Sequence, residues 1–134
     1  MAMPVVSLSA PLKEFIAERH LATLVTLRSD GSPHAVPVGF TCREVDGGVV
    51  LRVITFASAV KARHAARGGR GSIMQVDGGR WVSFEGSVRL ATDDASVADA
   101  VAAYATRYRP PKQREDRVVV ELVVDHLMSS SALR

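Results

Sequence analysis

The sequence predicts a mainly β fold, a small six-stranded antiparallel β-barrel with flanking helices. Six stretches are rich in β-branched or alternating apolar residues. Tight-turn sequences such as Asp30-Gly31, Asp46-Gly47-Gly48 and Asp77-Gly78-Gly79 separate neighbouring stretches, and such turns are typical of antiparallel hairpins. Six strands in an open sheet leave exposed edges, and closure into a barrel removes them.

A short helix is predicted before the first strand. Ser9 can cap its N-terminus, Pro11 lies in its first turn, and Leu12, Phe15 and Ile16 form an apolar stripe. Three strands are then expected at residues 21–28, 33–43 and 49–55.

Two further helices separate the remaining strands. The first is expected from Ser58, as its N-cap, to Arg67, with glycines beyond its end. The second is capped by Asp93 or Asp94 and extends to about Tyr108. The other three strands are expected at residues 71–76, 80–91 and 117–127. Residues 109–116 contain two prolines and five charges, which indicates an exposed loop.

The length and composition favour one cytoplasmic domain over residues 1–134. Apolar residues make up 47% of the 134-residue chain, and no apolar run approaches the ~20 residues that span a bilayer. The N-terminus lacks the pattern of a secretory signal. The single cysteine, Cys42, excludes an internal disulfide, and no metal site is expected because the four histidines are scattered.

The junction at residues 54–61 is the best candidate for an anion site. A strand ends there and a helix begins, so free backbone N–H groups and the positive end of the helix dipole face outward. A lysine in the first helical turn is unfavourable unless an anion lies nearby. A phosphate would satisfy Lys61, together with the hydroxyls of Thr55 and Ser58. The alternative is that Lys61 points into solvent.

Few other residues suggest chemistry. Trp81 can belong to a core or interface, or it can border a groove for a planar ligand. Ser83 and Cys42 have no nearby base, so we assign no catalytic residue and expect redox chemistry to come from a cofactor.

The run of residues 61–80 carries five basic residues and one acid, which attracts anions. Nucleic acid is not expected as a partner, because aromatics are only 5% of the chain.

Several segments resemble the pyridoxamine-phosphate-oxidase-like split-barrel superfamily. They are His20-Leu-Ala-Thr-Leu-Val-Thr-Leu-Arg28, Asp30-Gly-Ser-Pro-His-Ala-Val-Pro-Val-Gly-Phe40, Arg52-Val-Ile-Thr55 and Lys61. The resemblance is closest to the actinobacterial branch that uses coenzyme F420, an 8-hydroxy-5-deazaflavin. Within it, Gln75-Val-Asp-Gly-Gly-Arg-Trp81, Glu85-Gly86, Arg107-Tyr-Arg109 and Arg117-Val-Val-Val-Glu121 look like the deazaflavin-dependent biliverdin reductase group.

The resemblance implies a homodimer of split β-barrels with cofactor sites between the two chains. The deazaflavin rings would lie along the strand that holds His34, Ala35, Val36, Pro37, Val38 and Gly39. The phosphate would meet the segment with Ile54, Thr55, Phe56, Ser58, Val60 and Lys61, and Trp81 would border the groove. Val60 departs from the more polar loops of the family, since it offers no side-chain donor.

The implied activity is hydride transfer from reduced F420 to an organic acceptor, biliverdin first of all, which gives bilirubin. The acceptor's propionates would bind arginines that the sequence does not identify. Two alternatives stay open at this point. One is an FMN-binding oxidoreductase of the same fold, and the other is a non-catalytic protein that binds F420 or haem.

Overall fold

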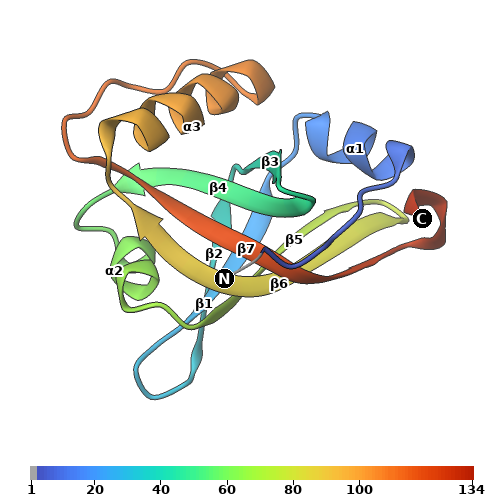
Figure 1. Ribbon diagram of the computed structural model, residues 1–134, viewed down its shortest axis with the longest axis horizontal. Helices are drawn as coiled ribbons and strands as arrows, with labels where there is room; N and C mark the ends of the chain where they lie inside the picture. The colour runs from blue at the N-terminus through green and yellow to red at the C-terminus, as the bar shows by residue number, and fades with distance from the viewer. Residues whose placement is uncertain (1–2) are drawn as a thin grey trace.

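The computed structural model describes residues 3–134, so residues 1 and 2 of the predicted domain lie outside it (Figure 1). The described residues form three α-helices, seven β-strands and a short 3₁₀ helix. The helices are α1 (Ala10–Ala17), α2 (Val60–Arg67) and α3 (Asp94–Arg107), and η1 (Ser131–Leu133) follows the last strand. The strands are β1 (Ala22–Leu27), β2 (Pro33–Val38), β3 (Thr41–Val45), β4 (Gly48–Phe56), β5 (Arg70–Asp77), β6 (Arg80–Ala91) and β7 (Arg117–Ser129).

All seven strands belong to one antiparallel sheet, in the order β2-β1-β5-β6-β7-β4-β3. Leu24 of β1, Leu51 of β4, Phe84 of β6 and Leu122 of β7 all belong to one buried cluster. Since β1 and β4 lie near opposite ends of the sheet order, the sheet must curl for both to reach that cluster. The prediction of a mainly β, antiparallel fold is confirmed.

The prediction of six strands is wrong, because the stretch 33–43 forms two strands instead of one. The chain leaves β2 at Val38 and starts β3 at Thr41, and these two strands lie at opposite ends of the sheet order. The break is at Gly39. A Cβ there would lie 2.9 Å from the ring of Tyr108 and 3.1 Å from that of Tyr104. A glycine therefore lets the chain cross beneath the end of α3.

Two of the three predicted helix caps are confirmed. The Ser9 hydroxyl accepts a hydrogen bond from Leu12 N at 3.1 Å, and the Asp93 carboxylate accepts one from Ser96 N at 3.0 Å. The prediction of Ser58 as the cap of α2 is wrong. The N-cap is Ala59, whose side chain has no acceptor, so no side chain caps the first turn.

A bulge in the long β6–β7 ladder accounts for the Glu85-Gly86 pair. Glu85 is opposite His126 and Gly86 is opposite Val124, so Asp125 has no partner in the ladder. A Cβ on Gly86 would lie 1.9 Å from the carbonyl oxygen of Val123. The close approach of the two strands at this point therefore requires glycine.

The helices cover different parts of the curled sheet. In Figure 1, α3 lies across β4, whereas α2 and α1 lie near opposite ends of the sheet. Arg52 of β4 is 5% exposed and donates to the Asp99 carboxylate of α3 at 2.5 Å, which ties this helix to the strand. None of the helices in residues 3–134 is long and apolar enough to cross a membrane.

Candidate functional site

A cavity of about 710 Å³ lies where the end of β4 meets the start of β7. Its lining comes from five places in the chain: the end of β2, the end of β4, the first turn of α2, α3 with the loop after it, and the start of β7. The lining residues are Pro37, Val38, Gly39, Val53, Ile54, Thr55, Phe56, Lys61, Tyr104, Arg109, Pro110, Pro111, Lys112, Gln113, Arg114 and Arg117.

Every charged side chain that lines this cavity in residues 3–134 is cationic, and one of them, Arg114, is paired with Asp116 beside the cavity. Five cationic side chains line it, and no aspartate or glutamate does: Lys61, Arg109, Lys112, Arg114 and Arg117. Crowded cations in one concave site raise the local concentration of anions. The arrangement fits a ligand that carries several negative charges.

Lys61 lies in the first turn of α2 and contributes to the cavity. Burial lowers the pKa of its ammonium, and within residues 3–134 it forms no ion pair. Because no side chain caps this helix, its first N–H groups are also without a capping acceptor. An anion bound here would receive hydrogen bonds from both the lysine and the backbone.

The loop after α3 is held in place over the cavity. The Arg114 guanidinium donates to the Asp116 carboxylate at 2.8 and 3.0 Å, and it lies over the Phe56 ring at 4.3 Å. Ala57 N donates to Asp116 O at 2.9 Å, and Arg117 donates to Lys112 O at 2.5 Å. The loop is therefore a wall of the site and is fixed to the end of β4.

Seven of the thirteen predicted cofactor-binding residues gather in this cavity. Those seven are Pro37, Val38, Gly39, Ile54, Thr55, Phe56 and Lys61. Ser58 and Val60 are exposed beside it without contributing to the lining. Thr55 lines the cavity although the residue is only 3% exposed.

The remaining predicted residues of β2 alternate between its two faces. His34 and Val36 are partly buried, and Val36 packs against the core, whereas Ala35 is exposed on the opposite face. A planar ring therefore cannot contact all these side chains at once. β2 is an edge strand, however, because it pairs only with β1. Its outer backbone groups are available to a ligand along its length.

His34 packs against a second histidine that the sequence did not connect with it. Its ring meets the ring of His64 edge-on, with centroids 5.2 Å apart, and its Nδ1 is buried without a hydrogen-bond partner in the described chain. His64 Nδ1 lies 2.7 Å from the Thr26 hydroxyl. Burial, reinforced by the charge of Arg67, lowers the pKa of His64, so its neutral form is favoured.

Trp81 does not line the cavity of its own chain. It borders another cavity of about 530 Å³ with residues of the C-terminal segment, and its backbone N–H donates to the Ser130 hydroxyl at 3.0 Å. Arg117, at the start of β7, lines the first cavity, whereas the β6 end that holds Trp81 pairs with Ser129 at the other end of β7. Within one chain, the two places are at opposite ends of the longest strand.

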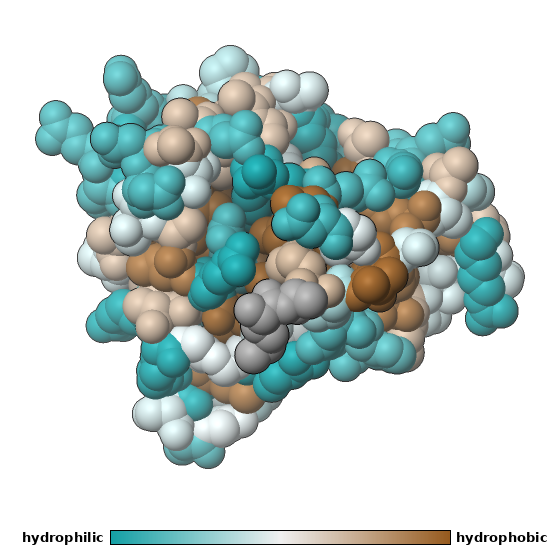
Figure 2. Space-filling view, in the orientation of Figure 1, coloured by the Kyte–Doolittle hydropathy of each residue, from teal (hydrophilic) through white to brown (hydrophobic). Residues whose placement is uncertain are grey.

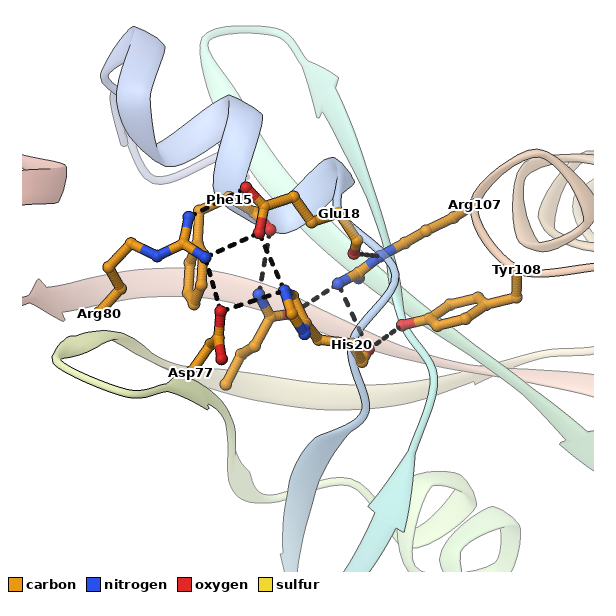
Figure 3. A network of polar contacts seen from close by, with 8 residues as sticks. Phe15, Glu18, His20, Asp77, Arg80, Arg107 and Tyr108 are labelled. Atoms are coloured by element: carbon orange, nitrogen blue, oxygen red, sulfur yellow. Dashed lines mark hydrogen bonds and ion pairs between the residues drawn. The ribbon is translucent and has the colours of Figure 1, made fainter.

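The Gln75–Trp81 segment and the Arg107-Tyr108 pair form a structural network (Figure 3). Gln75 is fully buried; it donates to Phe15 O at 3.1 Å and accepts from Arg107 Nη2 at 2.5 Å. Arg107 also donates to Glu18 O at 2.9 Å, and Tyr108 donates to His20 O at 2.7 Å. The end of α3 is thereby fixed to the segment between α1 and β1.

A second part of the network surrounds Arg80. Its guanidinium donates to both carboxylate oxygens of Glu18 at 2.9 Å and to Asp77 at 2.6 Å (Figure 3). The hydrogen bonds from Arg80 to Glu18, followed by the one from His20, lower the pKa of Glu18 to about 2. Arg80, one of the five basic residues in the 61–80 run, is therefore neutralised. The same holds for Arg70, which is paired with Asp125 at 2.5 and 2.8 Å.

Sequence reasoning missed the cationic loop as part of the site. Arg109, Lys112 and Arg114 were predicted to lie in an exposed loop, and all three line the cavity. The available signal was the density of positive charge beside two prolines, which stiffen a loop. The fold brings this loop to Lys61 because β7, which follows it, pairs with the end of β4.

The fold and the sequence both place this chain in a known family. The sequence profile of the pyridoxamine 5'-phosphate oxidase family matches residues 8–129, and the chain belongs to this family. It is 44% identical over 119 residues to an F420H(2)-dependent biliverdin reductase of Mycobacterium tuberculosis (strain CDC 1551 / Oshkosh). That alignment covers 89% of this chain and 85% of the relative.

Solved structures show the same fold. A conserved hypothetical protein of Mycobacterium tuberculosis has a TM-score of 0.77 at 24% identity, with 96% of this chain and 87% of that chain covered. An F420 reductase has a TM-score of 0.68 at 22% identity, with 87% of this chain and 94% of that chain covered.

Proposed function

We propose that this protein is an oxidoreductase that uses reduced coenzyme F420 and reduces a tetrapyrrole acceptor of the biliverdin type. The observation that carries the proposal is the cavity with five cations and no acid. The 44% identical relative, named for its dependence on F420H(2) and for biliverdin, supports both the coenzyme and the acceptor.

The cavity fits the coenzyme better than it fits FMN. F420 carries a phosphate, a lactate carboxylate and a polyglutamate tail, whereas the side chain of FMN ends in one phosphate. Lys61 and the uncapped start of α2 suit the phosphate. Lys112 and Arg109 are then available for the carboxylates.

The ring system would lie along the edge of β2, from His34 to Gly39. Because β2 is an edge strand, its free N–H and C=O groups can pair with the polar edge of a ring. Pro37, Val38 and Gly39, at the end of this strand, line the cavity. His34 faces His64 rather than the cavity, so its contribution would be to hold the strand.

The coenzyme, when bound, supplies a hydride from C5 of its ring. The protein contributes position and electrostatics. In the described chain, the lining contains no aspartate, glutamate or histidine, so no side chain of that kind is placed to donate the accompanying proton. We infer that this proton comes from water or from a pyrrole of the acceptor.

We also propose that the working form is a homodimer. The outer face of the sheet exposes apolar side chains, with Met74 43%, Val76 60% and Met128 45% exposed. The partner chain would cover this face, and it would supply Trp81 to the groove if that residue borders the cofactor.

The test is a reaction of the purified protein with reduced F420 and biliverdin, compared with other acceptors and with FMN. We expect biliverdin-dependent loss of reduced F420, formation of bilirubin, and tighter binding of F420 than of FMN by calorimetry. Tighter binding of FMN would favour the FMN alternative. Binding of F420 without oxidation by any acceptor would indicate a binding protein.

A further inference from the structure

A second cavity adjoins the proposed coenzyme site and has its own unpaired cations. It measures about 410 Å³ and is lined by Arg19, His20, Leu21, Tyr104, Tyr108 and Arg109. Tyr104 and Arg109 also line the larger cavity, so the two spaces meet at these residues. A molecule in the second cavity would therefore share these two residues with one in the first.

The arginines of this second cavity differ from most others in residues 3–134 in their hydrogen-bond partners. Nine of the fourteen arginines bind carboxylates or backbone carbonyls. In that described part, the guanidiniums of Arg19 and Arg109 have no carboxylate or carbonyl partner. Guanidiniums bind carboxylates with two parallel hydrogen bonds, and neither of these is engaged in that way.

The floor of the second cavity is rigid and aromatic. The rings of Tyr104 and Tyr108 lie with centroids 4.9 Å apart. Tyr108 is fixed through its hydroxyl, which donates to His20 O at 2.7 Å and accepts from Phe40 N at 3.2 Å. Leu21, which is 67% exposed, adds an apolar side chain next to these rings. A flat conjugated molecule suits such a surface.

We propose that this second cavity binds the acceptor, and that Arg19 and Arg109 hold the carboxylates of a planar conjugated dicarboxylate such as a linear tetrapyrrole. The inference rests on the proposed function, since it names the acceptor subsite of the same enzyme. The conjugated system lies against Tyr104 and Leu21 and extends toward the larger cavity. Arg109, at the junction, also contacts the coenzyme.

Equilibrium titration without coenzyme tests the subsite, with biliverdin and its dimethyl ester as probes. The ester keeps the conjugated system and loses both charges. Arg19→Gln should weaken the binding of biliverdin by about tenfold and change that of the ester by less than about twofold. Arg43→Gln is the matched control, since Arg43 is exposed on β3 and lines neither cavity.

Arg109→Gln should weaken both biliverdin and F420, whereas Arg19→Gln should leave the affinity for F420 unchanged. In turnover, Arg19→Gln should raise KM for biliverdin with little change in kcat. Equal effects of Arg19→Gln on acid and ester, or no effect on either, would overturn the subsite. If the wild-type protein still oxidises reduced F420 with biliverdin, those outcomes would contradict the subsite and leave the proposed function unaffected. Conversely, a wild-type chain that discriminates acid from ester but does not oxidise reduced F420 would support the subsite and overturn the proposed function.

Discussion

Lys61 is a cation in two unfavourable positions, at the start of a helix and partly buried. A cation at the start of a helix is repelled by the helix dipole, and burial adds a second cost that lowers its pKa. Both costs disappear when an anion binds beside it. The side chain of Ala59 cannot cap the helix, and the first turn of α2 contains no acidic residue that could take the place of that anion.

Lys61→Ala should therefore weaken coenzyme binding without weakening the fold. A hydrogen bond to a charged group contributes about 1.5–3 kcal/mol, which corresponds to roughly tenfold or more in Kd. The difference should shrink in high salt, since the lysine is only partly buried. Calorimetric titration with F420 measures it. Lys13→Ala serves as the control, because Lys13 pairs with Glu44 on the surface, and equal affinities of wild type and Lys61→Ala would mean that the backbone alone holds the phosphate.

His64 should make the stability of the fold depend on pH. Burial lowers its pKa in the folded chain below the ordinary 6.5, so as the pH falls below about 6.5 the unfolded chain takes up the proton first. This contribution to stability is complete above that pH and is lost below it. Urea unfolding at several pH values should show a smaller loss between pH 7 and 5 for His64→Gln than for wild type. The exposed His126→Gln should behave as wild type, and parallel curves for all three chains would contradict the assignment.

At the scale of elements, the sequence predicted the hairpin turns and the central residues of the strands. It did not predict the contacts by which distant elements pack together. Asp46 and Gly47 have positive φ angles of 52° and 76°, as the predicted hairpin turn requires. The break at Gly39 was missed because it depends on two tyrosines about seventy residues away in the chain. The same holds for the cationic loop, whose place over the cavity depends on the β4–β7 pairing. Local patterns carry no information about such contacts.

The hydrogen bonds of Arg107 should be essential for holding the end of α3 against the sheet. Arg107→Met would leave Gln75 Oε1, Phe40 O and Glu18 O without their donor. Buried acceptors without partners cost about 1–3 kcal/mol each, and the partly buried site suggests a total of about 3 kcal/mol. Thermal unfolding should therefore show a Tm lower by about 10 °C. Arg107→Lys should lose less, and the neighbouring Arg109→Gln should lose nothing; a wild-type Tm for Arg107→Met would show that water replaces the guanidinium.

At the scale of the whole molecule, the outer face of the sheet exposes apolar side chains that no element of the described chain covers. The register places Pro37, Thr23, Met74, Ser83 and Met128 in one row across five strands. Val76 and Trp81 form a cross-strand pair next to this row. In the view of Figure 2, hydrophobic patches reach the surface between polar side chains. Exposed patches of this kind mark interaction surfaces, and a second copy of the chain is the partner that the proposed function implies.

Met74→Glu should separate the two chains, because each copy would bring a charge to the same apolar face. Light scattering should change from the mass of two chains for wild type to that of one for Met74→Glu. Val5→Glu is the control, since Val5 is 84% exposed and the next residue, Val6, donates to Gly47 O in the turn between β3 and β4. A monomeric wild type at micromolar concentration would overturn the homodimer, and with it any role for Trp81 at the cofactor.

Trp81 provides the last test, because its place in one chain differs from the place that the family resemblance implies. It lies at the far end of β7 from the cavity of its own chain, so a monomer should show no change of its fluorescence with F420. In a dimer whose partner brings Trp81 to the other cavity, F420 should quench that fluorescence. Quenching should therefore occur in wild type and disappear in Met74→Glu. If wild-type emission stays constant at saturating F420, Trp81 packs only against its own C-terminal segment and lies outside both cofactor sites.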